Sequence, residues 1–217
     1  PEVDRISEEG LANLSRTPGR RTSVEPADPA GVDPEADDLS VYQFLYWPIV
    51  EGATAPSPAA LANIEAFMKF GGLVIFDTRD DERAADGAAT PARAALRTVL
   101  ANIDMPPLAP PPPDHVLYRS FYLLDDLSGR TSLNPVYVQA GGDANDAVTP
   151  VIIGGRDWAG AWAADSLGNP LLPMAQGGER AREIALRAGV NMVMVALTGN
   201  YKSDQVHAPI LLERLGR

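Results

Sequence analysis

Residues 71–80 read GGLVIFDTRD, and this stretch decides the fold class of the chain. A run of apolar residues follows a glycine pair and ends abruptly at charged side chains. An uninterrupted apolar run is typical of a strand buried on both faces, as in a parallel sheet covered by helices. Open sheets of this kind bind ligands just beyond the carboxyl ends of their strands. The stretch therefore predicts an α/β fold and a candidate site at Asp77, Arg79 and Asp80.

Helix signals alternate with strand signals around this stretch. Ser57-Pro58 and Thr90-Pro91 each combine an N-cap side chain with a proline suited to the first helical turn. Residues 41–47 and 151–153 are aromatic or β-branched runs that predict strands. This alternation is the pattern of βαβ units.

The chain divides into an N-terminal arm and one α/β domain. Apolar residues between Val3 and Leu14 recur at helical spacing, which predicts an amphipathic helix. Residues 25–40 are acidic and contain prolines, so we interpret them as an extended, solvated connector. We therefore expect an arm over 1–40 and a single domain over 41–217.

The second half of the chain gives weaker signals. The segment PPLAPPPP at 106–113 predicts polyproline II structure, either a stiff spacer or a ligand for a proline-recognising domain. Strands are expected at 116–124 and 135–139, a polar loop at 141–146, and helices at 179–197 and 206–215.

Composition excludes several classes of partner and site. The 217 residues carry a formal net charge of −11, which argues against nucleic acid and against an anionic membrane surface. The chain has no cysteine, which removes disulfides and thiolate chemistry. No segment is apolar enough to span a membrane. Because the chain starts at Pro1 without methionine, we expect an excised domain whose anchor or targeting signal lies outside it.

Charged residues follow both predicted central strands. If the two strands are parallel neighbours, Arg156 and Asp157 lie beside Asp77, Arg79 and Asp80. Carboxylates at such an edge could act as general acid or base or hold a divalent cation, and arginine could bind an anion. The alternative is that these charges pair with one another and fix the loops.

Three further residues are candidates for the same site. His115 lies beside Asp114 before a predicted strand and could be a base, although a structural hydrogen-bonding role is the alternative. Arg119 could join the edge or face solvent. Trp158 could stack on a ligand, or it could pack with Trp162 against the core. Phosphate-binding loops, nucleophile elbows and zinc-protease motifs are missing, so we expect no cofactor and no metal.

Five ordered blocks of the sequence resemble one bacterial family. They are 46–49 (YWPI), 72–80 (GLVIFDTRD), 114–124 (DHVLYRSFYLL), 150–162 (PVIIGGRDWAGAW) and 189–202 (GVNMVMVALTGNYK). The family is a domain of unknown function, found C-terminally in membrane proteins that begin with a BatA-type aerotolerance-regulator segment.

The resemblance implies a fold and a setting for the chain. The family is similar to class I glutamine amidotransferase-like, ThuA-related proteins, which implies a flavodoxin-like three-layer sandwich with a mostly parallel sheet. Active amidotransferases use a nucleophilic cysteine, and this chain has none. We therefore expect a non-catalytic domain that binds a small molecule or a protein and is tethered to the bacterial inner membrane. The alternative is a metal- or carboxylate-dependent enzyme that acts on a sugar-like molecule through Asp77, His115 and Asp157.

Overall fold

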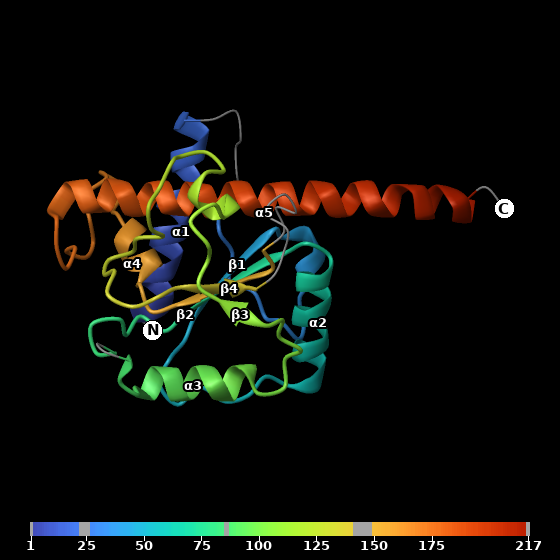
Figure 1. The fold of residues 1–217 in the computed structure, drawn as a ribbon, viewed down its shortest axis with the longest axis horizontal. Helices are drawn as coiled ribbons and strands as arrows, with labels where there is room; N and C mark the ends of the chain where they lie inside the picture. The colour runs from blue at the N-terminus through green and yellow to red at the C-terminus, as the bar shows by residue number, and fades with distance from the viewer. Residues whose placement is uncertain (1, 22–26, 85–86, 141–148, 216–217) are drawn as a thin grey trace.

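The computed structural model describes residues 2–21, 27–84, 87–140 and 149–215, and for 18–21 and 199–215 it describes the backbone alone. The helices are α1 (Glu2–Arg21), α2 (Pro58–Lys69), α3 (Pro91–Leu100), α4 (Trp158–Trp162) and α5 (Gly178–Leu215), with short 3-10 helices η1 (Leu39–Val41) and η3 (Val116–Tyr118). The strands are β1 (Phe44–Pro48), β2 (Leu73–Asp77), β3 (Leu108–Ala109), β4 (Tyr137–Gln139) and β5 (Val151–Gly154). Figure 1 shows their arrangement.

The sheet is open and mixed, with strand order β1-β2-β5-β4-β3. The strands β1, β2 and β5 run parallel, whereas β4 is antiparallel to both β5 and β3. In the parallel part, Phe76 pairs with Ile153 and Asp77 with Gly154, so β2 and β5 end side by side. The expectation of a parallel sheet is therefore confirmed for one end of the sheet, and the chain has the expected α/β class.

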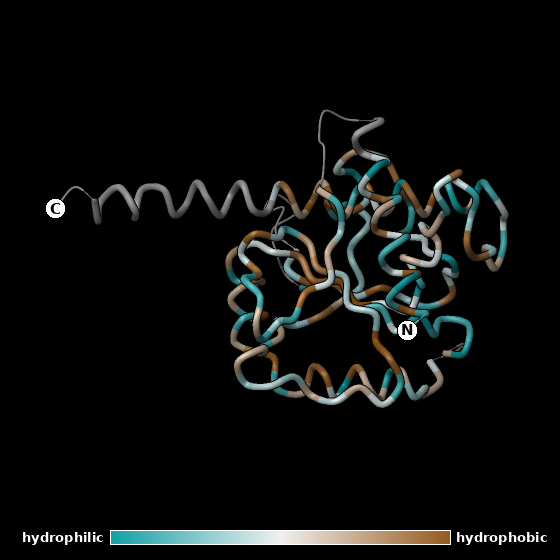
Figure 2. Tube along the Cα trace, turned by 180° about the vertical axis from the view of Figure 1, so that it is seen from behind, coloured by the Kyte–Doolittle hydropathy of each residue, from teal (hydrophilic) through white to brown (hydrophobic). Residues whose placement is uncertain are grey.

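Helices cover both faces of the sheet. Alternate side chains of β2 point to opposite faces, because successive residues of a strand do so. Leu73 and Ile75 enter a first core cluster with α1, α4 and α5. Val74 and Phe76 enter a second cluster with α2 and α3. Figure 2 shows the hydrophobic colour concentrated along the central strands and hydrophilic segments mainly in the outer helices and loops.

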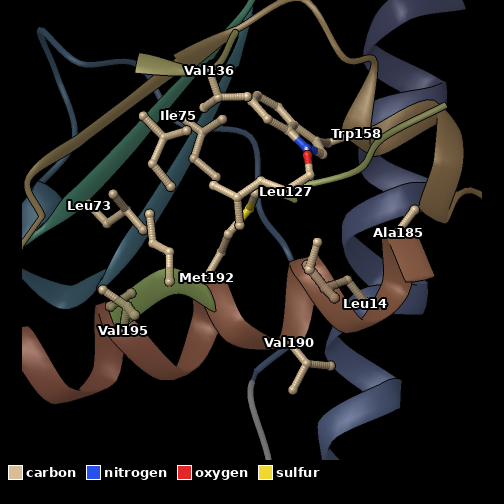
Figure 3. Packing of buried hydrophobic residues seen from close by; sticks show 14 of the residues in the cluster. Leu14, Leu73, Ile75, Leu127, Val136, Trp158, Ala185, Val190, Met192 and Val195 are labelled. Atoms are coloured by element: carbon tan, nitrogen blue, oxygen red, sulfur yellow. Dashed lines mark hydrogen bonds between the residues drawn. The ribbon is translucent and has the colours of Figure 1, made fainter. Parts of the chain in front are cut away.

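The first cluster is built around β2, α4 and α5. Figure 3 shows Leu73 and Met192 within it, and the ring of Trp158 beside Val136 and Leu127. Trp158 is fully buried, and its indole N–H donates to the Leu127 carbonyl oxygen at 3.0 Å. The buried indole thus has the hydrogen-bond partner that burial of a polar atom requires.

The two predicted helix starts are confirmed. The Ser57 hydroxyl accepts from the Ala60 N–H, and the Thr90 hydroxyl accepts from the Arg93 N–H, with proline in the first turn of each helix. These side chains satisfy amide groups that have no partner within the helix. Gly71, two residues before β2, has φ of 92°, a conformation that glycine adopts at no steric cost.

Several other sequence predictions are wrong. Residues 116–124 do not form a strand, because η3 is followed by irregular chain that packs on α5. The two expected C-terminal helices are one continuous helix, α5. Part of the proline-rich segment is β3, which pairs with β4 in the sheet. The expected loop at 141–146 lies outside the described residues.

The connector and the arm both contact the domain. Val32 packs against the second cluster, and the Asn63 side chain donates to the Pro34 carbonyl oxygen at 2.9 Å. The connector is therefore less solvated than its composition predicts. In the arm, α1 packs along α4, and its Leu14 is part of the first cluster.

The close contact between α1 and α4 depends on Gly10. A Cβ atom at this position would lie 2.3 Å from the Ala159 carbonyl oxygen, which is a backbone atom that cannot rotate away. We expect Gly10→Ala to lower the free energy of unfolding by about 1–3 kcal/mol, because overpacking outweighs the gain in helix propensity. Urea denaturation would measure this change. Gly31→Ala is the control, since nothing lies within 4 Å of that position, and equal stability of the two variants would contradict the packing argument.

Candidate functional site

The topology places the carboxyl ends of β2 and β5 side by side, where the chain departs to opposite faces of the sheet. The chain leaves β2 towards α3, which belongs to the second cluster, and leaves β5 into α4, which belongs to the first. Neighbouring parallel strands whose connections depart to opposite faces are the usual position of ligand sites in open α/β sheets. We call this region the carboxyl edge.

Asp77 is the most buried charged residue at the carboxyl edge. Its side chain is fully buried and accepts the Tyr46 hydroxyl at 2.8 Å. It also accepts the backbone N–H groups of Arg79, Asp157 and Trp158, at 2.9, 3.2 and 2.8 Å. Asp157 is the N-cap position of α4, but its own side chain makes no capping bond. Asp77 therefore caps α4 from a different strand.

The surroundings of Asp77 disfavour its ionised form. Burial raises the pKa of Asp77 to about 7, and the neighbouring Asp157 carboxylate adds to the rise. The hydrogen bonds from the Trp158 N–H, the Tyr46 hydroxyl and the Arg79 N–H act in the opposite direction and limit it. Burial also raises the pKa of Tyr46 well above its usual value, and the carboxylate of Asp77 adds to that effect. Tyr46 thus remains a hydrogen-bond donor at neutral pH.

This pKa makes the stability of the fold depend on pH. The unfolded chain has an Asp77 pKa of about 3.9, so between about pH 4 and pH 7 the folded chain binds more protons than the unfolded one. The stabilisation from the neutral carboxyl is complete below about pH 4 and is lost as the pH rises towards about 7. We expect the wild type to lose about 2–3 kcal/mol relative to Asp77→Asn between about pH 5 and pH 8. Urea unfolding of both proteins would measure this, and parallel pH profiles would contradict it.

Asp157 is held by an arginine that precedes it in sequence. The Arg130 Nε atom donates to the Asp157 carboxylate at 2.5 Å, and the two side chains are 24% and 11% exposed. Asp157 has φ of 51°, a left-handed conformation that aspartate adopts more readily than most residues. The carboxylate is therefore fixed between the Arg130 guanidinium and the buried Asp77.

Asp80 and Asp81 fix neighbouring loops through hydrogen bonds. Asp80 accepts the hydroxyls of Thr78 and Thr90, which ties the end of β2 to the start of α3. Asp81 accepts the backbone N–H groups of Leu133 and Asn134, at 2.6 and 2.9 Å. Asp80 thus ties the loop after β2 to α3, and Asp81 ties the same loop to the loop before β4.

The two predicted arginines are also engaged by the protein. Arg156 pairs with Asp126 through both terminal nitrogens, at 2.6 and 3.2 Å, and donates to the Asn134 carbonyl oxygen. Arg79, with φ of 52°, donates to the Ile49 carbonyl oxygen at 3.0 Å. The structure thus brings Asp77, Arg79, Asp80, Arg156 and Asp157 to one edge, where protein groups bind all of them.

His115, Arg119 and Trp158 do not add reactive groups to this edge. His115 lies beside Thr149, which precedes β5, and so it is near the opposite end of that strand. Its Nδ1 atom accepts the Leu117 N–H at 3.2 Å, and burial lowers its pKa, so the neutral ring caps η3. Arg119 borders a hollow of about 480 Å³ formed by residues 113–125 of a single segment. Trp158 belongs to the core.

A cavity of about 340 Å³ lies beside the carboxyl edge. It is lined by the loop 128–133, by residues 174–177, by the first turns of α5 and by Glu82. The loop is attached to the edge because Arg130 binds Asp157 and the Thr131 N–H donates to the Arg156 carbonyl oxygen. The volume is within the usual range for small-molecule sites.

Sequence reasoning missed the residues that connect the edge to the cavity. Arg130 lies in the polar segment SGRTS, 27 residues before its partner Asp157. No local pattern marks it, because its role depends on a contact between distant loops. The neighbouring Gly129 is the one weak sequence signal for this contact, since a Cβ atom there would lie 2.3 Å from the Arg156 carbonyl oxygen. A glycine in that position indicates close approach of two backbones.

Two properties of the described residues bear on metals and on membranes. Among them, no group of three or more histidine, cysteine, aspartate or glutamate side chains is arranged so that it could hold a metal ion. No helix within the described part of the chain is long and apolar enough to cross a membrane.

Comparison with known proteins gives one family. No curated protein matches the sequence. The family model described as a domain of unknown function, DUF4159, matches residues 1–197, which include α1, the whole sheet and about the first half of α5. The chain therefore belongs to the DUF4159 family.

Proposed function

We propose that this domain binds a small molecule in the cavity beside the carboxyl edge and does not transform it. The observation that carries the proposal is the engagement of the edge carboxylates by the fold. Asp77 accepts four hydrogen bonds while fully buried, and Asp157 is paired with Arg130. A general acid or base must reach its substrate within hydrogen-bond distance, and a side chain without exposed surface does not do so.

The cavity supports a binding role in its own right. Its lining combines Arg130 with backbone-rich polar loops and with apolar side chains such as Leu133 and Met174. Ligand sites are typically concave, largely apolar and equipped with a few fixed polar groups. Arg130 is fixed by its ion pair with Asp157, so it is positioned before any ligand arrives.

A fragment screen by thermal shift tests this proposal. Ala181 lines the cavity from α5, so Ala181→Phe should fill it without removing a charged group. We expect fragments that raise the melting temperature of the wild type and not that of Ala181→Phe. Ala62→Phe, at an exposed position of α2, is the matched control and should respond like the wild type. If no fragment distinguishes Ala181→Phe from Ala62→Phe, the cavity is not a binding site.

A second candidate is a carboxylate-dependent enzyme that acts on a sugar-like molecule. It is favoured by one observation, the pKa of about 7 at Asp77 beside the Asp157 carboxylate. Pairs of carboxylates with separated pKa values are typical of acid–base sites. Glycoside and ester hydrolysis assays with wild type and Asp157→Ala decide between the two functions. A turnover that disappears in Asp157→Ala would favour the enzyme and contradict simple binding.

The setting of the domain is a separate proposal. The five sequence blocks support a flavodoxin-like, class I glutamine amidotransferase-like fold and a parent protein anchored in the bacterial inner membrane. The resemblance to proteins with a BatA-type N-terminal segment is the basis for this. Fractionation of cells that express the full-length parent protein would test it, and recovery of that protein in the soluble fraction would contradict it.

A further inference from the structure

We infer that the ligand of this cavity is a small organic molecule with one carboxylate and an apolar body, and that Arg130 binds the carboxylate. This inference rests on the proposed binding function and adds the chemical class of the ligand. It starts from the guanidinium group. Arg130 uses its Nε atom for Asp157, and no described residue accepts a hydrogen bond from its two terminal nitrogens.

The remaining donors of Arg130 fit a carboxylate. A guanidinium presents its N–H groups in a planar fork that matches the two oxygens of a carboxylate. The Arg130 side chain lines the cavity and is 24% exposed, so its free end is accessible while its inner nitrogen is held by Asp157. The ion pair thus fixes the orientation of the fork and lowers the entropic cost of binding an anion.

Thr131 provides an independent observation beside Arg130. Its hydroxyl is buried and has no hydrogen-bond partner among the described residues, and the residue itself lines the cavity. A buried hydroxyl without a partner costs roughly 1–3 kcal/mol. The hydroxyl oxygen has no exposed surface in the ligand-free chain, so a ligand oxygen reaches it only if the Thr131 side chain turns towards the cavity. Arg130 therefore carries the recognition of the carboxylate, and Thr131 contributes only after such a rotation.

The charges around Arg130 limit the ligand to one negative charge. Asp157 already neutralises part of the guanidinium charge, and the exposed Glu82 also lines the cavity. A dianion such as a phosphate monoester would meet repulsion from both carboxylates, whereas a monoanion is repelled less. We therefore expect a carboxylate to bind more tightly than a phosphate monoester with the same chain.

The apolar side chains that line the cavity fit the alkyl body of the proposed ligand. Leu133 is 59% exposed although it is a large hydrophobic residue, and it faces a cavity also lined by Met174 and Ile184. Burial of an alkyl chain against these residues stabilises the complex by about 0.8 kcal/mol for each CH₂ group. A short-chain carboxylate thus matches both halves of the cavity.

Three probes with the same alkyl chain test the inference: hexanoate, hexanamide and hexyl phosphate. We expect the wild-type chain to bind hexanoate with a dissociation constant on the order of 1 mM, as for a well-matched fragment. Hexanamide and hexyl phosphate should each bind at least about tenfold more weakly. Hexanamide has no negative charge to pair with Arg130, and hexyl phosphate carries a second negative charge that Asp157 and Glu82 repel. Ligand-observed NMR, with constant ionic strength, gives all three constants.

Variants of Arg130 show whether its charge binds the carboxylate or whether the residue only maintains the shape of the cavity. Arg130→Gln should weaken hexanoate binding by about 10- to 100-fold and leave hexanamide binding within about twofold of wild type. Arg130→Lys, which keeps the charge, should fall between the two. Arg83→Lys is the control, because Arg83 forms an exposed ion pair with Glu51 and is not one of the residues that line the cavity. Circular dichroism would confirm that each variant is folded before binding is measured.

The outcomes distinguish this inference from the proposed function. Equal affinity for hexanoate and hexanamide, tighter binding of hexyl phosphate, or unchanged hexanoate affinity in a folded Arg130→Gln variant would overturn the ligand class. In those cases, binding that is abolished by Ala181→Phe would still support the cavity as a site. If hexanoate binds wild type and Ala181→Phe equally, the ligand class and the cavity are both contradicted.

Discussion

Asp77→Ala should lower the free energy of unfolding by about 3–5 kcal/mol, the largest loss expected from any single substitution at the carboxyl edge. The physical reason is the loss of one acceptor that serves four donors at once. The Tyr46 hydroxyl and the backbone N–H groups of Arg79, Asp157 and Trp158 would have no protein partner. Two of these amides begin α4, so that helix would lose its cap.

Urea denaturation at about pH 6, where the carboxyl is largely protonated, would measure this loss. Asp28→Ala is the control, because Asp28 is exposed and such surface changes are usually within about 0.5 kcal/mol. A loss below about 1 kcal/mol for Asp77→Ala would show that the edge tolerates removal of its central carboxylate. That result would weaken the structural role assigned to Asp77 and favour the enzyme reading.

Asn191→Ala should lower the free energy of unfolding by about 3 kcal/mol. The Asn191 side chain is fully buried in α5 and makes four hydrogen bonds to η3 and the segment that follows it. Its oxygen accepts the N–H groups of Phe121 and Tyr122, and its nitrogen donates to the carbonyl oxygens of Leu117 and Tyr122. Removal would take these hydrogen bonds from the backbone of Leu117, Phe121 and Tyr122, in a segment that the structure describes as a 3-10 helix and irregular chain outside the sheet.

The matched control is Asn63→Ala, which removes a single exposed hydrogen bond to the Pro34 carbonyl oxygen. Its expected loss is about 0.5–1 kcal/mol. Hydrogen exchange adds a local measurement, because the amides of Phe121 and Tyr122 should exchange faster in Asn191→Ala. Unchanged exchange of these amides would contradict the view that Asn191 holds the segment in place.

The elements predicted correctly are those whose signals are local. Ser57-Pro58 and Thr90-Pro91 define their helices through atoms within three residues, and the apolar run of β2 reflects burial on both faces. The segment 116–124 was predicted as a strand because it is rich in aromatic and aliphatic residues. Its actual structure is set by Asn191, about 70 residues away, which no local pattern reveals.

The same distinction applies to the candidate site. The charges that follow β2 and β5 were predicted to meet, because the ends of adjacent parallel strands share an edge, and the register of Asp77 with Gly154 brings them together. His115 does not join these charges, since it lies beside Thr149, which precedes β5, and so near the opposite end of that strand. Arg130 and the cavity were not predicted, because they arise from contacts among the loops 128–133 and 174–177 and the start of α5.

Together these contacts divide the carboxyl edge into a structural part and a binding part. The carboxylates of Asp77, Asp80 and Asp81 hold the ends of α4, α3 and the loop before β4. Arg130 belongs to both parts, because one nitrogen completes the ion pair with Asp157 and the others border the cavity. We therefore expect substitution of Arg130 to weaken ligand binding more than substitution of Asp80 does, even where the two substitutions lower the free energy of unfolding equally.

A titration of the ¹⁵N-labelled chain with hexanoate, followed by amide chemical shifts, tests most directly whether the cavity binds a carboxylate. We expect the largest saturable shift changes at residues 128–133, at residues 174–177 and in the first turns of α5, which form most of the lining of the cavity. Asp157 and Trp158 should shift as well, because the Arg130 ion pair connects them to the ligand. Saturable changes centred on residues 113–125, around the second hollow, or no saturable change anywhere, would contradict carboxylate binding in the cavity.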